Sequence, residues 1–260
     1  MSNSINKMFL CIIIVSSYFV VSCSNIKDPN SPDFPPNTAV AVAVDTVNNE
    51  IYVANNSNFS VTVYGRTDTG NVPPIRTISG ASTGLYFPGG LAVDTINNEV
   101  FVANYYNKSV TVYGRTDTGN VAPIRTISGA STGLSYPANI ALDVVNNQIF
   151  VANYMNISAD GHQTSGSITV YGRTDSGNVA PIRTISLANT SFNYVKGIAL
   201  DTVNNQIFVS NSLGIAVYGR TDTGNVAPVR MISGVSTGLS GPTSIAVDTV
   251  NNEIFVTNQI

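Results

Sequence analysis

From residue 38 onward, the chain is a succession of short apolar runs separated by polar turns, and the runs recur in groups of four. In the second group they are Gly90–Val93, Glu99–Ala103, Ser109–Tyr113 and Ile124–Ile127, here called runs A, B, C and D. The runs are rich in Val, Ile, Tyr, Phe and Thr, which favour a pleated, packed surface. No run reaches ten residues before an Asn, Gly or Pro intervenes. The pattern therefore predicts four β-strands in each group and disfavours helices.

The groups are near copies of one another. The decapeptide VYGRTDTGNV occurs at 63–72, 112–121 and 217–226, and a copy with Ser176 in place of Thr occurs at 170–179. The Asp that ends run A sets the register, with spacings of 49, 49, 58 and 47 residues between Asp45, Asp94, Asp143, Asp201 and Asp248. A repeat of this length with four antiparallel strands is typical of a β-propeller blade. The competing parallel β-helix has much shorter coils.

The turns between runs A and B share one sequence, Asp-Thr-Val-Asn-Asn or a close variant. Asn tolerates positive φ, and an Asp side chain can accept backbone N–H bonds in a tight turn. Between runs C and D lies Gly-Arg-Thr-Asp-Thr-Gly-Asn-Val, which is also turn-forming. We therefore expect the repeated polar residues to have structural roles.

Three segments carry a family resemblance: Pro-x-x-Ile-Ala-Val-Asp at 242–248, Asn-Asn-Glu-Val-Phe-Val-Ala-Asn at 97–104, and Ser-Val-Thr-Val-Tyr-Gly-Arg at 109–115. They resemble the YVTN-type and NHL-type propeller repeats of bacterial envelope proteins. Ile51–Asn55 and Phe255–Asn258 hold the YVTN-like core. The resemblance covers residues 38–260 and implies a propeller. It leaves the activity open, because such propellers include lactonases, lyases and binding proteins.

The repeat units are not all complete, since there are five A–B pairs and only four C–D pairs. The expected fold is therefore an all-β propeller of four-stranded antiparallel blades, four complete blades plus a two-stranded fifth. Its ring is thin or open, or the sequence is part of a longer propeller. Run B of the fifth unit, Glu253–Thr257, would expose an unpaired edge, which invites pairing with another chain.

The first 37 residues predict export. Residues 1–22 read as a signal peptide, with Lys7, the apolar run Met8–Val21 and small Ser22. Val20–Cys23 resembles a bacterial lipobox, in which Cys23 becomes lipidated; the alternative is an ordinary signal peptide with an incidental Cys. Residues 23–37 would be the lipidated Cys23 and a flexible Pro-rich tether. The expected location is the bacterial cell envelope, lipid-anchored, with Ser24 compatible with the outer membrane.

Candidate binding residues lie in the loops where the units differ, between runs B and C and between run D and the next run A. The candidates are Tyr86, Phe87, Tyr105, Tyr106, Tyr136, Tyr154, Met155, Asp160, His162, Phe192 and Tyr194. Aromatic rings on loops can stack on sugars or anchor a peptide, or they can fold inward and fill space between blades. Asp160 and His162, in the insert Tyr154–Gly166, are either a metal or acid–base pair or part of a solvated loop.

The charged residues bear on which classes of function are favoured. All eight Arg are repeat residues, for which pairing with repeat Asp such as Asp68 or Asp117 is favoured over an anion-binding ring. With a net charge of −3 and no basic cluster, nucleic-acid binding is disfavoured. We predict a non-enzymatic binding or scaffold module for a glycan, peptide or envelope protein. The alternative is a lactonase-like hydrolase or lyase with a metal-assisted pocket at the propeller axis. No catalytic residue and no cofactor is predicted, although Ca²⁺ held by repeat Asn and Asp oxygens remains open.

Overall fold

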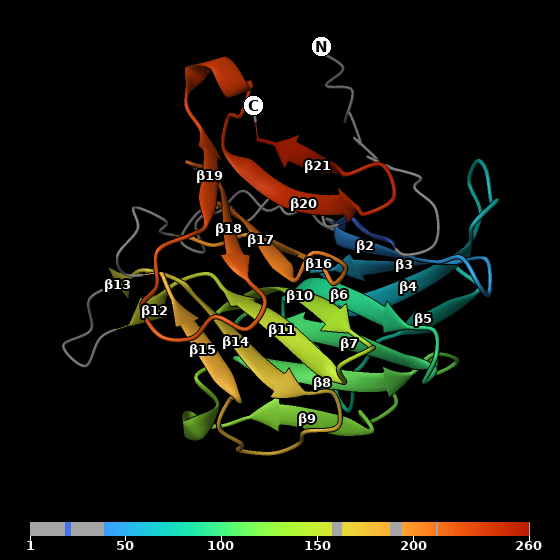
Figure 1. The fold of residues 1–260 in the computed structure, drawn as a ribbon. Helices are drawn as coiled ribbons and strands as arrows, with labels where there is room; N and C mark the ends of the chain where they lie inside the picture. Colours follow the sequence, from blue (N-terminus) through green and yellow to red (C-terminus); the bar gives the residue numbers. More distant parts are fainter. Residues whose placement is uncertain (1–18, 22–38, 158–162, 188–193, 212, 260) are drawn as a thin grey trace, which may run out of the picture.

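A computed structural model describes residues 19–21, 39–157, 163–187, 194–211 and 213–259 (Figure 1). The structure is all-β, as the sequence predicts, and each repeat unit forms one antiparallel sheet in the order A-B-C-D. The first blade contains β2 (Ala39–Asp45), β3 (Glu50–Asn55), β4 (Ser60–Gly65) and β5 (Arg76–Ile78); the second, β6 (Pro88–Asp94), β7 (Glu99–Asn104), β8 (Ser109–Gly114) and β9 (Arg125–Ser128). The third contains β10 (Pro137–Asp143), β11 (Gln148–Asn153), β14 (Ser167–Gly172) and β15 (Arg183–Ser186); the fourth, β16 (Gly197–Asp201), β17 (Gln206–Asn211), β18 (Gly214–Gly219) and β19 (Arg230–Ser233).

The fifth unit is a two-stranded sheet of β20 (Pro242–Asp248) and β21 (Glu253–Asn258), so the predicted thin last blade is confirmed. Three short strands lie outside this scheme. The insert in the third unit contributes β12 (Asn156–Ile157) and β13 (Gln163–Thr164), which pair with each other. Near the N-terminus, β1 (Phe19–Val21) pairs antiparallel with β2 and also contacts β20. Short 3₁₀ turns, Ala130–Thr132 and Val235–Thr237, follow strands β9 and β19.

The A strands are the inner strands of the blades. Strands β2, β6, β10, β16 and β20 contact one another in that order around the centre, and the D strands β5, β9, β15 and β19 lie outermost. Close packing here explains small residues in run A: a Cβ on Gly90 would come within 2.6 Å of Asn139 Cα, and one on Gly197 within 2.9 Å of Ser244 Cα. Among the described residues, no helix is long and apolar enough to span a membrane.

The hydrophobic core lies between neighbouring blades. Each described interface is one cluster of buried side chains from two consecutive units, and strand C contributes a fully buried tyrosine to three of them: Tyr113, Tyr171 and Tyr218. Burying such a side chain stabilises the fold by about 1.5–3 kcal/mol. Tyr113 and Tyr171 also donate to the carbonyls of Thr83 and Thr132 in the preceding unit. The apolar core therefore joins each blade to its neighbours.

The C–D turns of units two, three and four are also bonded to the outer strand of the blade before them. Gly119 N donates to Thr77 O at 2.6 Å, and Gly119 O accepts from Ser79 N at 3.0 Å. The same bridge joins Ile127 to Gly177 and Ile185 to Gly224. These bridges, here called interblade clamps, run backward along the chain from each unit to its predecessor.

The predicted turn chemistry is confirmed. In the A–B turns, the Asp side chain accepts from the backbone and side-chain nitrogens of the Asn three residues later, as Asp45 does from Asn48 at 2.8 Å. The second Asn of each pair has a positive φ of 54–57°, at Asn49, Asn98, Asn147, Asn205 and Asn252. The repeated Asp and Asn residues of these turns therefore shape the backbone.

Candidate functional site

The B–C and D–A loops meet at one end of the blades, because the strand registers place the start of strand A beside the end of strand B. Within a unit they are bonded together: Tyr105 N donates to Phe87 O, and Tyr154 N to Tyr136 O, both at 3.0 Å. The Asn that ends strand B secures the D–A loop, since Asn104 Oδ1 accepts from Tyr86 N at 3.1 Å and Asn153 Oδ1 from Ser135 N at 2.9 Å. This end of the propeller thus carries fixed loops.

Aromatic rings from four units form a continuous row on these loops. Consecutive ring centroids along the row are 4.6–5.8 Å apart, in tilted or edge-on orientations. The row, here called the aromatic cluster, consists of Phe59, Phe87, Tyr86, Tyr106, Tyr105, Tyr136, Tyr154 and Tyr194. Such spacings and orientations are favourable for aromatic pairs. The structure therefore brings together the aromatic candidates that it describes.

The cluster is divided between buried and exposed rings. Tyr105 is only 4% exposed, and the neighbouring Met155 6%, so these two fold inward and fill space at the blade ends. Tyr86 and Tyr194 are 42% and 38% exposed. The remaining rings are half-buried. The inward packing that the sequence left open is therefore confirmed for Tyr105 and Met155, while the other rings are partly exposed and their role in binding stays a prediction.

Several rings in the cluster sit on strained backbone. Phe59, Phe87, Tyr136 and Tyr194 have φ values of 51°, 51°, 51° and 62°, in the left-handed region that is uncommon for bulky side chains. The residue corresponding to Phe87 and Tyr136 in the fifth unit is Gly241, with a φ of 55°. Left-handed conformation costs about 1–2 kcal/mol for a residue with a Cβ. Strain of this kind at a residue with an accessible side chain is a recognised mark of a functional surface.

Charge on this surface is sparse. Lys108 places its Nζ 4.7 Å from the centroid of the Tyr136 ring, a cation–π contact. Lys196, at the loop end of inner strand β16, is 7% exposed and donates from Nζ to Gln259 Oε1 at 3.2 Å. Burial lowers the pKa of Lys196. A buried lysine with a depressed pKa is a candidate for amine chemistry as well as for ligand binding.

Lys196 was not among the residues that sequence reasoning selected. A signal for it was available: at this position the other four units carry Val40, Gly89, Ala138 and Thr243, none of them charged. Asp160, His162 and Phe192 lie outside the described residues, as does Cys23, so the structure does not place them. In the described part of the chain, no three His, Cys, Asp or Glu side chains gather as a metal site.

The repeat arginines form ion pairs at the other end of the blades, and only some of their partners are those expected. Arg76 and Arg115 both bind Glu50 at 2.8 Å, and Arg220 binds Asp143 at 3.0 Å. Asp68 instead accepts from the backbone of Gly65 at 2.8 Å. Burial acts to raise the pKa of Glu50, but hydrogen bonds from Arg76 and Tyr52 and the charges of Arg76 and Arg115 outweigh it and hold that pKa below its ordinary value. The expected pairing with repeat Asp residues holds for Arg173 and Arg220, which bind Asp94 and Asp143 of the preceding blade. The two Asp residues named as examples, Asp68 and Asp117, were wrong, because each bonds to the backbone of its own turn.

No protein-family model matches the sequence, and no curated protein matches it. Among solved structures, a chain from the crystal structure of a nidogen/laminin complex has a TM-score of 0.62 at 13% identity, covering 92% of this chain and 84% of that one. The Kuenenia stuttgartiensis hydrazine synthase has a TM-score of 0.58 at 15% identity, covering 85% of this chain and 56% of that one. Identities this low show the fold alone. The protein is a β-propeller, similar in fold to the propeller chains of both complexes.

Proposed function

We propose that the propeller is a non-enzymatic binding module whose aromatic cluster engages a glycan, a peptide or an envelope protein. The observation that carries the proposal is the row of partly exposed rings, four of them on left-handed backbone. Protein stability alone would favour Gly or Asn at those four positions. Retaining Phe and Tyr there is explained if the rings are needed for contact with a partner. Tyr rings suit this role because they are rigid and present both an apolar face and a hydroxyl.

The similarity to a chain of the nidogen/laminin complex is compatible with binding, since that structure is of a protein complex. It adds no ligand identity, because one fold hosts many functions. The YVTN-like and NHL-like segments favour an envelope protein of bacteria. In that setting Cys23 would carry a lipid anchor and residues 24–37 would hold the propeller away from the bilayer.

The test is a screen of glycan and peptide arrays with the full chain and with the double variant Tyr86→Ala/Tyr194→Ala. These rings are the most exposed of the cluster, so the variant should remain folded and lose at least tenfold in affinity for whatever the wild type captures. Tyr64→Ala is the matched control, because Tyr64 is half-buried and lies next to the end of strand β4, at the opposite end of the blade. Equal capture by wild type and double variant would refute the proposed surface.

A lactone-hydrolysis assay with and without Ca²⁺ tests the alternative, a hydrolase or lyase with a pocket at the axis. Lys196 is the observation that favours this alternative. Turnover that is lost in Lys196→Met, or that depends on the metal, would replace the binding proposal with an enzymatic one.

The proposed membrane localisation is tested separately. Cys23→Ala should move the protein from the membrane fraction to the soluble fraction, because a single acylated Cys would be the anchor. A wild-type protein that is already soluble would refute lipidation.

A further inference from the structure

The outer edge of the fifth unit differs from that of every other B strand. In β7 all six residues are buried, whereas in β21 none is, and Ile254, Phe255 and Val256 are half-exposed. Within the described residues β21 pairs only with β20. In the other units the corresponding edge is covered by strand C. An edge with three consecutive apolar residues is a template for another strand.

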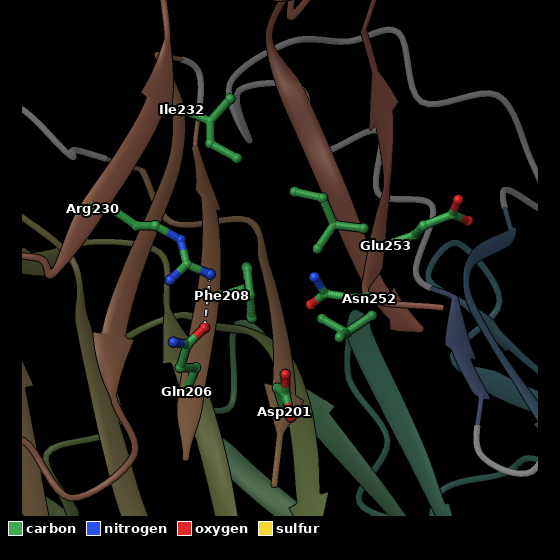
Figure 2. A pocket seen from close by; sticks show the side chains of 9 residues that line it. Asp201, Gln206, Phe208, Arg230, Ile232, Asn252 and Glu253 are labelled. Atoms are coloured by element: carbon green, nitrogen blue, oxygen red, sulfur yellow. Dashed lines mark hydrogen bonds between the residues drawn. The ribbon is translucent and has the colours of Figure 1, made fainter. Parts of the chain in front are cut away.

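A pocket of ≈ 200 Å³ lies beside this edge, between β19 and the β20–β21 pair (Figure 2). One wall contains Arg230, whose Nη2 donates to Gln206 Oε1 at 2.8 Å. Asp201 and Asn252 supply oxygens to the rest of the pocket; Glu253 also lines it, but its carboxylate is directed away from Arg230 (Figure 2). In the described part of the chain, the side chains of Asn252 and Glu253 have no hydrogen-bond partner, so this is an acidic pocket with acceptors available.

The closed interfaces show what such a pocket holds. Between units three and four, Arg220 donates from Nε to Asn205 Oδ1 at 3.1 Å and from Nη1 to Asp143 Oδ2 at 3.0 Å. Arg220 belongs to the C–D turn of the later unit and reaches back to the Asp of the earlier one. The repeat register makes Asn252 the counterpart of Asn205, and Asp201 the counterpart of Asp143. The pocket therefore presents the two acceptors that bind a turn arginine elsewhere.

A second arginine position is also defined. Glu50 and Glu99, the first residues of their B strands, bind Arg76 and Arg125, which open the D strands of the same units. Glu253 is their counterpart in unit five. The fourth and fifth units together thus offer acceptors for two arginines ten residues apart, the spacing of Arg115 and Arg125.

The outer strand of the fourth blade supports the same conclusion. Ile185 in β15 is fully buried and clamped to Gly224, but its counterpart Ile232 in β19 is half-exposed. The flanking residue Met231 is 46% exposed, and Thr237 is exposed whereas Thr132 is fully buried. All of these are places where the C–D hairpin of a following unit makes contact in blades one to three.

We propose that the edge of β21 and the adjoining acidic pocket form a docking site for an arginine-bearing β-hairpin supplied from outside residues 1–260. The hairpin pairs with Glu253–Asn258 as strand C does, inserts one arginine between Asp201 and Asn252, and brings a second to Glu253. This mode is β-strand addition, in which main-chain bonds supply affinity and side-chain pockets supply specificity.

None of the arginines within residues 1–260 is available to supply this hairpin. All eight arginines of the printed sequence lie in the four C–D segments already built into blades. A second copy would have to open one of its own blades to supply a hairpin. The pocket lies at the A–B turn end of the blades, opposite the aromatic cluster. The proposal therefore does not depend on the function proposed for that cluster.

The experiment uses the full chain in detergent and a fluorescent synthetic peptide with the sequence of residues 109–129, which contains both arginines. Fluorescence anisotropy should show saturable one-to-one binding. A peptide carrying Ala at the positions of Arg115 and Arg125 should bind at least tenfold more weakly, because charge-assisted hydrogen bonds are lost. Hydrogen exchange should slow at β19 and β21 in the complex.

Protein variants locate the site. Asn252→Ala and Glu253→Leu should each weaken binding about tenfold or more, because each removes an acceptor. Asn49→Ala is the matched control for Asn252→Ala, since both Asn have a φ of 56° and occupy the same turn position; it should leave binding unchanged. No binding at 1 mM peptide, equal binding of the arginine-free peptide, or a stable homodimer that the peptide does not dissociate would each overturn the proposal.

Discussion

At the strained aromatic positions, we predict that a Gly variant is more stable than the Ala variant, the reverse of the usual order. Phe87 has a φ of 51° and its ring contacts Phe59, Tyr86 and Tyr106. Truncation to Ala removes those contacts and keeps the Cβ that the left-handed region disfavours. Truncation to Gly removes both. At an ordinary position Gly is less stable than Ala by about 0.5–1 kcal/mol, because it gains more freedom on unfolding.

The expected difference in stability between the Gly and Ala variants is the backbone strain relieved minus the entropic cost of Gly. Relief of left-handed strain contributes about 1–2 kcal/mol in favour of Gly, and the Gly entropy opposes it by about 0.5–1 kcal/mol. Phe87→Gly should therefore be more stable than Phe87→Ala by about 0.5–1 kcal/mol. For a domain of this size that is about 1–4 °C in Tm. The Tyr136 pair of variants should behave in the same way.

The assay is urea unfolding followed by circular dichroism, with Gly241→Ala as the reverse control. Gly241 has the same backbone conformation, and a Cβ there meets only Gln259 at 3.5 Å, so Gly241→Ala should cost about 0.5–1 kcal/mol by the same difference. If Phe87→Ala equals or exceeds Phe87→Gly in stability, the backbone strain is not real. Backbone strain would then be no reason to expect that these rings serve in binding.

Two further predictions concern charge. Lys196→Met should stabilise the fold at pH 7, by about 1.4 kcal/mol for each unit by which burial depresses the pKa; the gain should shrink as pH rises toward the ordinary value of 10.5, where lysine loses its charge in the unfolded chain too. Thermal melts at several pH values check this, and a gain that grows with pH would contradict it. Glu50→Leu should cost about 3–5 kcal/mol because it leaves Arg76 and Arg115 without their carboxylate. Glu50→Gln should cost less stability, since Gln148 accepts from Arg183 at the same position. Both losses of stability should become smaller as pH falls below about 4.5, because protonation of Glu50 removes its stabilising contribution in the wild type. Equal effects of Leu and Gln in chemical denaturation would show that the ion pairs contribute nothing beyond packing.

Features fixed by local chemistry were predictable from the sequence. The Asp45 and Asn49 turn is an example, since both side chains act within a few residues of their own backbone. The gathering of the aromatic loops at one end also followed, because strand alternation fixes which loops share an end. In the same way, the unequal number of run types predicted the uncovered edge of β21.

Features that depend on how blades stack were not predictable. Glu50 looks like any polar residue opening a strand, yet it binds arginines from two units because the next blade places Arg115 beside it. The inward packing of Tyr105 and the exposure of Tyr86 depend on neighbouring loops and not on the residues themselves. The pairing of Phe19–Val21 with β2 likewise lay outside what the apolar run indicated.

The backward direction of the interblade clamps sets an order of events during synthesis. Outer strand β5 is held by Gly119, a residue made 41 positions after Ile78. At about 5–20 residues per second, a newly made blade therefore waits about 2–8 s for the turn that closes its outer strand. Throughout translation the most recent blade has an open edge that a chaperone or a neighbouring nascent chain can reach. The blades are therefore completed in order from the N-terminus, each one only after the C–D turn of the next unit has been synthesised.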